Sequence, residues 1–416
     1  MAVEALAGCD LPDQRLENLF APVLDRIPGD IAEYSNEFVV HNARAKAAFL
    51  ASPTMAHPDL LYPDVDVAVL TAQQRAIYEL IADLPSGGDG LQQLYVDLAM
   101  ERSAEIGRRL AMAAGSSFDF ARLDRRLYGE PSQEYFELVR PALSGKAIKP
   151  PKVPSTVAIG RVRAYIDSVA PRINEWLIDT KDGQLFEPEE IVKYLQMAIT
   201  HVPLLCGWRA VIGTGRKQNM SVNHDKCRVT VSPGTRVSFR ELQKLFGHEL
   251  LGHAVWAQQN KQAPLHILRR GLAGTSKVSE GLATVVSQVL MGETEELAGV
   301  EGYLAVGLAL GMDGSGGHNF REVFEIMKDY YIRQDPSRGI DDAIEKASSR
   351  AGRTFRGIKR GARGECSRKQ IIYLEGNLAV WEGIESEPKY FNKLKLGRWD
   401  PTNREQEAAL IQLIVR

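Results

Sequence analysis

The hexapeptide His248-Glu249-Leu250-Leu251-Gly252-His253 constrains this chain more than any other stretch, since it puts two imidazoles and a carboxylate into an apolar segment. Just before it, Ser238 and Glu241 form a Ser-x-x-Glu capping box, which predicts that a helix begins near Phe239. The apolar residues that follow give this helix a wide face that should be buried against a core. Burying a carboxylate without a partner costs about 3 kcal/mol or more. A cation bound beside Glu249 would remove that cost.

The spacing of the two histidines predicts a distorted helix. In the common His-Glu-x-x-His motif the histidines are four residues apart, or about 40° apart around a regular α-helix. Here they are five residues apart, or about 140°. Both imidazoles can reach one ion only if an extra residue is looped out in a π-type turn. We expect this distortion at Gly252, because glycine tolerates unusual backbone conformations most easily. A single buried His is usually a hydrogen-bonded core residue, but two His and a Glu within six residues favour a metal site.

A second helix is predicted from the turn at Thr275 to about Met291, with Gly292 just after its end. Glu280 is expected in its first turn. There the carboxylate could either stabilise the helix N-terminus or bind the same metal. Two His and one Glu would leave a fourth position for water, which is the pattern of catalytic rather than structural zinc sites.

A family resemblance is carried by five stretches in this order: residues 248–253, 261–273, 279–283, 354–357 and 367–376. With them the chain resembles the microtubule-associated tyrosine carboxypeptidases and their bacterial relatives, often called QEGLA-motif proteins, over roughly residues 155–383. The resemblance implies that His248, His253 and Glu280 bind one Zn²⁺ ion and that Glu249 is catalytic. Ser279 stands where the family motif has Gln. The hexapeptide also looks like that of dipeptidyl peptidase III, in which the ligating Glu lies further along a much longer chain.

The resemblance implies a zinc metallopeptidase that removes a C-terminal, tyrosine-like residue from a peptide or protein. Zinc would acidify a bound water, and Glu249 would take its proton as general base and pass it to the leaving amine. Two alternatives stay open: a catalytically silent, zinc-binding regulatory protein, and an exopeptidase like dipeptidyl peptidase III.

The fold class predicted is α+β and predominantly helical, with a gluzincin-like metallopeptidase core. The 416 residues, 44% hydrophobic and 25% charged, suit one large or two ordinary globular domains. Residues 1–143 show helical periodicity and predict an N-terminal helical layer. The segment 144–155, rich in Pro and Lys, is a predicted linker, and 156–416 a catalytic domain. Residues 209–213 and 228–232 are predicted strands, and by analogy 228–232 could pair with an extended substrate.

A local basic cluster is the candidate receiver of a substrate carboxylate, although it could equally be a solvated loop. It comprises Arg353, Arg356, Lys359, Arg360, Arg363, Arg368 and Lys369. Arg356 is the first candidate within it. Tyr373 could donate a hydrogen bond to the developing oxyanion or be a core tyrosine.

The remaining composition argues against several partners and compartments. The formal charge of −2 gives no general attraction to nucleic acid or to anionic membranes. No apolar run approaches the roughly 18 residues of a membrane span, and the N-terminus lacks the features of a secretory signal. Cys9, Cys206, Cys227 and Cys366 are far apart and are expected to be free thiols in a reducing cytoplasm. The sequence carries no signal for an oligomeric state.

Overall fold

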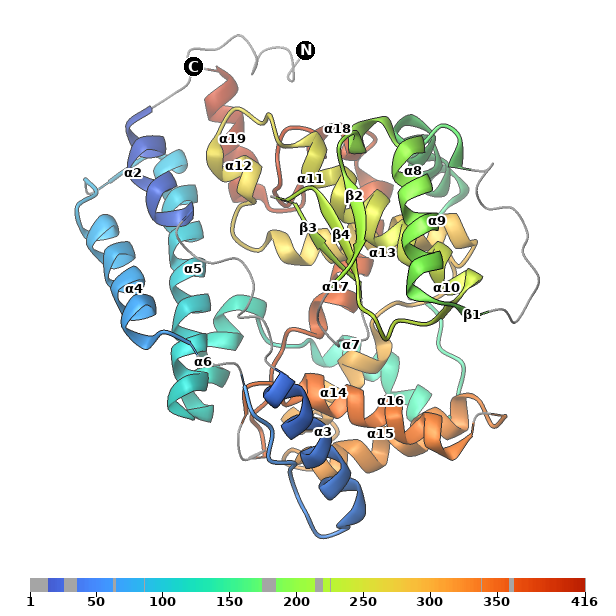
Figure 1. Cartoon of the computed structure of the whole chain (residues 1–416). Coiled ribbons are helices and arrows are strands. Elements are labelled where there is room, and N and C mark those ends of the chain that lie inside the picture. Colours follow the sequence, from blue (N-terminus) through green and yellow to red (C-terminus); the bar gives the residue numbers. More distant parts are fainter. Residues whose placement is uncertain are drawn as a thin grey trace.

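The computed structural model of the chain describes residues 14–25, 36–62, 65–85, 87–173, 185–213, 220–224, 226–337, 339–358 and 363–415. Helices dominate these residues, and two small sheets complete the fold (Figure 1). The predominantly helical α+β class is therefore confirmed. Among the described residues, none of the helices is both long enough and apolar enough to cross a membrane.

The N-terminal part is a set of helices on one side of the molecule and below it (Figure 1). Its helices are α2 (Gln14–Asp25), α3 (Asn36–Ala51), α4 (Val67–Ala82), α5 (Gly90–Ala114), α6 (Ser117–Tyr128) and α7 (Gln133–Val139), followed by the 3₁₀ turn η1 (Arg140–Ser144). Aspartate and serine side chains cap several of them: Asp66 accepts from the backbone N–H of Val69, and Asp89 from that of Gln92. The segment after η1 has no helix until α8 begins at Thr156.

The remaining elements run from residue 156 to the C-terminus. The helices are α8 (Thr156–Val169), α9 (Pro188–His201), η3 (Pro203–Leu205), α10 (Phe239–Leu245), η4 (Phe246–Ala254), α11 (Val255–Gln259), α12 (His266–Arg270), α13 (Thr275–Met291), α14 (Val300–Leu310), α15 (Phe320–Gln334), α16 (Ile340–Thr354), α17 (Ile371–Ser386), α18 (Tyr390–Leu394) and α19 (Arg404–Val415). The strands are β1 (Leu185–Phe186), β2 (Arg209–Ile212), β3 (Met220–Asn223), β4 (Arg228–Val231) and β5 (Val237–Ser238).

The larger sheet has the order β2-β4-β3. Strand β4 lies in its centre, parallel to β2 and antiparallel to β3. The prediction of strands at 209–213 and 228–232 is confirmed, but the suggested substrate pairing of 228–232 is wrong, because both edges of β4 are already hydrogen-bonded. The strand that packs against η4 is β3, which the sequence analysis did not predict.

Three hydrophobic clusters form the core of the described residues. The first joins α8, α9 and the sheet to η4, α13 and α17. The second joins α6 and α7 to α14, α15, α16 and α17, and the third joins α2, α4 and α5 to residues 263–272 and to α19. The second and third clusters therefore each contain side chains from both ends of the chain.

Helix α13 is buried at the centre of the first cluster and packs most extensively against α17 and η4. A Cβ on Gly281 of α13 would overlap the backbone oxygen of Gly376 on α17, so the two helices approach closely because both residues are glycine. A buried amide network joins them as well: the Gln288 side-chain oxygen accepts from Asn377 at 2.8 Å and from Trp381 at 2.9 Å. These contacts fix the position of the helix that carries Glu280.

Candidate metal centre and the adjoining cavities

The predicted helix around the hexapeptide is present, and it is a π-helix over nine residues. Ser238 caps α10 with the predicted capping box: its Oγ accepts from the N–H of Glu241, and the Glu241 carboxylate accepts from the N–H of Ser238. The chain then continues into the π-helix η4, which contains the whole hexapeptide. The wider turn brings the two histidine rings together, with centroids 4.9 Å apart. The predicted π-type distortion is thus confirmed and is longer than a single turn.

Gly252 serves a packing role in addition to the backbone role expected of it. A Cβ at this position would overlap the Cα and Cβ of Ala283 on α13. The absence of a side chain lets η4 lie directly against α13. The helix that carries Glu280 is thereby held close to the two histidines.

The Glu280 carboxylate points at both imidazoles. Its Oε2 lies 3.3 Å from Nε2 of His248 and 3.6 Å from Nε2 of His253. The three residues form the one group of at least three His, Cys, Asp or Glu side chains, among those the structure describes, that could hold a metal ion. Helix α13 begins at Thr275, so Glu280 lies in its second turn rather than at its N-terminus. This position argues against the alternative in which the Glu280 carboxylate stabilises the helix N-terminus.

The distances from the Glu280 carboxylate to the two imidazoles fit a tetrahedral zinc ion. Bonds of about 2.0–2.2 Å to such an ion would place its donor atoms about 3.3–3.6 Å apart. The two measured separations fall in this range. Moreover, Oε2 of Glu280 is buried and has no hydrogen-bond partner among the described residues, because neither contact has hydrogen-bond geometry. An orphaned buried oxygen facing two imidazole nitrogens is the arrangement expected around a cation.

The electrostatics of the cluster also favour a cation. Burial alone would raise the pKa of the Glu280 carboxyl, but the two imidazoles beside it bring that pKa well below its usual value. Burial would lower the pKa of His248, but Glu280 and Glu249 raise it. The interactions between the carboxylates and the imidazoles therefore outweigh burial on both groups, and they favour an ionised Glu280 carboxylate, which is the form that binds a cation.

Ser279 touches a member of this cluster, which the sequence analysis missed. Its Oγ lies 3.0 Å from Nδ1 of His253. An imidazole that binds a metal through one nitrogen usually donates its other N–H to such a partner, which fixes the ring and its tautomer. The sequence contained one indication of this contact: Ser279 directly precedes Glu280, at the position where the QEGLA motif has Gln.

The other predicted site residues have different surroundings. Glu249 and Tyr373 are both half-buried, and Tyr373 interacts electrostatically with Glu249 and Glu280. Burial, together with these two carboxylates, raises the pKa of the Tyr373 phenol. Its hydroxyl group therefore stays protonated and able to donate. Arg356 is exposed, beside Tyr62 and Arg353, and it lines neither of the cavities described below.

The basic cluster around Arg356 is divided among several environments. Arg363 pairs with Glu322, and Arg368 is buried with its Nε 2.9 Å from Glu130. Lys369 lines a cavity that reaches Glu280. Lys359 and Arg360 lie outside the described residues.

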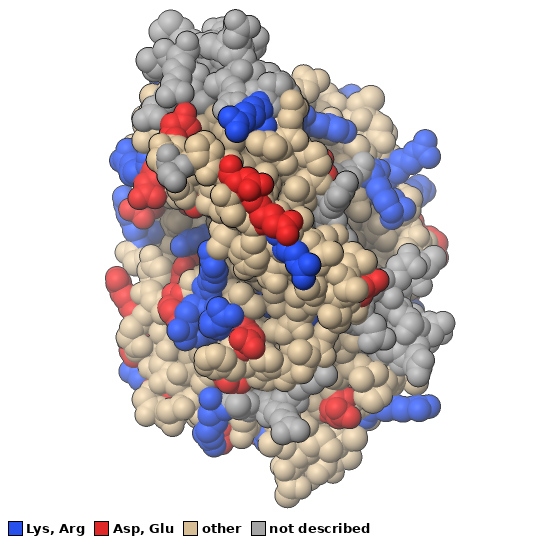
Figure 2. All heavy atoms as spheres, turned by 90° about the vertical axis from the view of Figure 1, so that its left-hand side faces the viewer, with Lys and Arg blue, Asp and Glu red and all other residues tan. Residues whose placement is uncertain are grey.

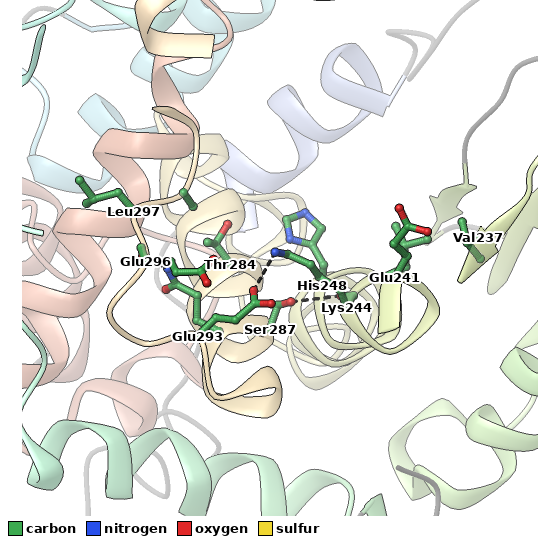
Figure 3. A pocket seen from close by; sticks show the side chains of 12 residues that line it. Val237, Glu241, Lys244, His248, Thr284, Ser287, Glu293, Glu296 and Leu297 are labelled. Atoms are coloured by element: carbon green, nitrogen blue, oxygen red, sulfur yellow. Dashed lines mark hydrogen bonds and ion pairs between the residues drawn. The ribbon is translucent and has the colours of Figure 1, made fainter. Parts of the chain in front are cut away.

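One cavity, of about 400 Å³, opens on the His248 side of the cluster (Figure 3). Helices α10 and α13 and the segment 293–298 enclose it, and its wall is mainly apolar, with Leu245 and Leu297 among the lining residues. Lys244 reaches across its rim to Glu293, at 2.7 Å. An aromatic or aliphatic side chain would fit these surroundings.

A second cavity, of about 390 Å³, reaches the cluster from the Glu280 side. One wall is the N-terminal helix α5, and the opposite wall is formed by residues 270–280 with Lys369, Ile372 and Arg398. We call it the basic cavity. The sequence analysis assigned no chemistry to residues 1–143, because nothing in their pattern places α5 beside Glu280.

His224 is a further residue near the cluster that the sequence analysis did not single out. It lies on the turn between β3 and β4, close to His253 and Arg398. Burial, aided by the charge of Arg398 and by the proximity of His253, lowers the pKa of His224 to about 3, so its imidazole is neutral. Its Nδ1 is buried without a hydrogen-bond partner among the described residues.

The comparison with protein families gives a clear result. The family model of the microtubule-associated tyrosine carboxypeptidases matches residues 165–404. The chain belongs to this family. No curated protein and no solved structure matches it in the corresponding comparisons.

The match to the tyrosine carboxypeptidase family covers the whole candidate metal centre but not the whole cavity system. His248, Glu249, His253 and Glu280 lie within residues 165–404, as do Arg356 and Tyr373. Helix α5, at Gly90–Ala114, lies outside the matched segment. This chain therefore lines one side of the cavity system with a helix that lies outside the matched residues.

Proposed function

We propose that this chain is a zinc-dependent carboxypeptidase that removes the last residue, tyrosine or a similar aromatic residue, from a peptide or protein. The observation that supports this most directly is the convergence of Glu280 Oε2 on the Nε2 atoms of His248 and His253, in the sequence context of a carboxypeptidase family. A gluzincin-like core, with two ligands on one helix and a Glu on a later helix packed against it, would account for this geometry.

His248, His253 and Glu280 would hold one zinc ion, and Ser279 would orient the His253 ring. When bound, zinc acidifies a water molecule and polarises the carbonyl of the scissile bond. Three protein ligands leave room for that water, as in catalytic zinc sites.

Glu249 would act as general base and acid. It follows His248 directly in the π-helix and is not needed as a ligand. Its carboxylate would take the proton of the attacking water and deliver it to the leaving amine. Tyr373, held protonated and close to both Glu249 and Glu280, would donate a hydrogen bond to the carbonyl oxygen as negative charge develops there.

The mainly apolar cavity beside His248 would bind the side chain of the substrate's last residue. Its dimensions and lining suit a single aromatic ring, in line with the aromatic preference that the family name describes. The proposed substrate is a peptide or protein with an accessible C-terminus. Whether tubulin is among the substrates is a question for the assay below.

A peptide library tests the proposal. Peptides with varied C-terminal residues are incubated with the purified protein, with and without a chelator, and the products are identified by mass spectrometry. We expect loss of one C-terminal residue, fastest for tyrosine, abolished by the chelator and restored by zinc. Release of dipeptides from the N-terminus would support the dipeptidyl-peptidase-III-like alternative. Stoichiometric zinc without any product would support the silent regulatory alternative.

A further inference from the structure

The mainly apolar cavity beside His248 carries an ion pair on its wall. Nζ of Lys244 lies 2.7 Å from Oε2 of Glu293, and both residues line the cavity (Figure 3). Arg240, which does not line the cavity, holds the other carboxylate oxygen of Glu293 at 2.8 Å. The proposed function assigns this cavity to the side chain of the last residue but gives the ion pair no role.

The Glu293 carboxylate differs from most charged groups of the protein, because its side chain is only 9% exposed. On the outer face of the N-terminal helices, by contrast, acidic and basic groups are interspersed at the surface (Figure 2). Exposed groups of that kind contribute little to binding, whereas a buried carboxylate attracts a hydrogen-bond donor more strongly, since the surrounding dielectric is low. Glu293 is therefore the stronger acceptor for a donor group that enters the cavity.

The other polar groups on the α13 wall of the cavity are largely engaged within the protein. The Ser287 hydroxyl donates to the backbone oxygen of Lys244 at 3.2 Å (Figure 3). The Gln288 side chain donates to the backbone oxygen of Glu296 at 2.6 Å and accepts two hydrogen bonds from α17. Among the lining side chains of α13, Thr284 is left as the alternative to the ion pair.

The lining carries more negative than positive charge. Glu241, Glu293 and Glu296 stand against Lys244. This balance disfavours an acidic side chain in the cavity and favours a group that can donate a hydrogen bond.

The spacing along the helix suits a tyrosine side chain. Lys244 precedes His248 by four residues, which is about one helical turn, or about 5 Å along the axis. This distance is similar to the length of a tyrosine side chain. With the scissile carbonyl at the candidate metal centre, the ring would pack against Leu245 and Leu297, and its hydroxyl would reach the ion pair.

We propose that the ion pair of Lys244 and Glu293 recognises the phenol hydroxyl of the substrate's last residue. The phenol O–H donates to the Glu293 carboxylate, and the Lys244 ammonium, which has three donors, donates to the phenol oxygen as well as to Glu293. The inference rests on the proposed carboxypeptidase function and deepens it, because it makes both residues specificity-determining for Tyr over Phe. Hydrogen bonds to charged groups are strong enough to change affinity by about 10- to 100-fold.

Binding to protein that lacks the proposed base tests this inference independently of turnover. Zinc-loaded Glu249→Gln protein is titrated with three fluorescent peptides that differ only in the last residue, which is Tyr, Phe or Lys. We expect the Tyr peptide to bind about 10-fold or more tightly than the Phe peptide, and the Lys peptide to bind no more tightly than the Phe peptide. Tightest binding of the Lys peptide would show that the cavity recognises a cation instead, and would overturn the inference.

The variants Glu293→Gln and Lys244→Met, each in the Glu249→Gln background, locate the effect. Each should lower the ratio of Tyr to Phe affinity by about 3- to 10-fold, mainly by weakening binding of the Tyr peptide. Glu325→Gln is the matched control, because Glu325 is likewise held by an arginine and a lysine, here on its own helix α15, but does not line the cavity. It should keep the ratio of the parent protein. Zinc content and thermal melting confirm that each variant is folded.

Thr284→Val tests the alternative contact for the hydroxyl. A ratio of Tyr to Phe affinity that falls in this variant, but in neither Glu293→Gln nor Lys244→Met, would overturn the assignment to the ion pair. Equal affinity of the parent protein for the Tyr and Phe peptides would overturn it as well. Absence of cleavage by the unmodified protein, with the Tyr preference in binding intact, would instead count against the proposed carboxypeptidase function.

Discussion

Oε2 of Glu280 lies 3.3 Å from Nε2 of His248, and no hydrogen bond joins them. A buried carboxylate oxygen this close to an imidazole would ordinarily accept its proton. Nε2 of His253 lies 3.6 Å from the same oxygen, so the two imidazoles converge on one carboxylate oxygen. This geometry supports the proposal that the three side chains bind one metal ion, and the proposal can be tested residue by residue.

Substitution of the ligand and of the base should separate metal binding from turnover. Glu280→Ala removes one of three ligands, so the purified protein should lose most of its zinc. Glu249→Gln removes only the base, so zinc should stay near one per chain while peptide cleavage falls by about 10²–10⁴-fold. Metal analysis by mass spectrometry beside a cleavage assay measures both. A fully active Glu249→Gln protein would refute the assignment of the base.

Ser279→Ala should weaken zinc binding without removing a ligand. The Ser279 hydroxyl lies 3.0 Å from Nδ1 of His253, and loss of such a partner typically lowers metal affinity by about 10–100-fold. Competition with a chelator of known affinity gives the value. Ser279→Thr, which keeps a hydroxyl, should retain most of the affinity. Equal zinc affinity in the Ala variant and the parent protein would show that the contact does not orient His253.

Gly252→Ala should disrupt the contact between η4 and α13. The new methyl group would overlap the backbone of Ala283, and overpacking of this kind costs about 1–3 kcal/mol in the free energy of unfolding. Gly160→Ala is the matched control, because Gly160 lies on the exposed face of α8 with open space around it. The control should be more stable than the parent protein by about 0.5–1 kcal/mol. Chemical denaturation of both variants tests whether their changes in the free energy of unfolding have opposite signs.

Glu101 predicts a pH dependence of stability. Burial raises its pKa to about 7, although a hydrogen bond from the backbone N–H of Gly274 and the charge of Arg102 partly oppose this. A carboxyl group whose pKa is raised on folding stabilises the protein below its unfolded pKa, and this contribution is lost as pH rises through the folded value. Wild type should therefore lose stability between about pH 5 and pH 8.

Glu101→Gln should remove most of this pH dependence, since Gln resembles the protonated carboxyl. The variant should gain up to about 3 kcal/mol relative to wild type on going from pH 5 to pH 8. Denaturant unfolding at both pH values measures the change. Parallel stability curves for the two proteins would mean that Glu101 titrates in the folded state as it does in the unfolded state.

The convergence of His248 and His253 and the backbone distortion between them could be predicted from local spacing, whereas Glu280 became a candidate ligand through the family resemblance. A five-residue separation between histidines demands an extra residue in the turn, and the nine-residue π-helix supplies it. The helix through Glu280 was likewise predicted to end at Met291, where Gly292 adopts a left-handed conformation with φ of 70°. The placement of Glu280 in the first turn was wrong: the helix already begins at Thr275, after the N-cap Gly274, whose N–H donates to Glu101, so Glu280 lies in the second turn.

The surroundings of the cluster could not be predicted, because they depend on contacts between distant segments. Helix α5 and Lys369 line the same cavity, but they lie far apart in the sequence and no periodicity relates them. Strand β3 was missed because Met220–Asn223 is short and alternates without strong apolar character. Arg356 was chosen for its charge and its family-like neighbours, whereas the fold places it on the surface beside Tyr62.

Two hydrophobic clusters contain side chains from both ends of the chain, and they limit how this protein can be cut into fragments that fold. A fragment limited to residues 165–404 would retain every proposed ligand, yet it would expose Leu268 and Leu272, which α2, α4 and α5 cover in the intact chain. Such a fragment should aggregate rather than form a minimal peptidase. The N-terminal helices and the half of the chain that carries the proposed ligands would then have to be inherited together as one folding unit.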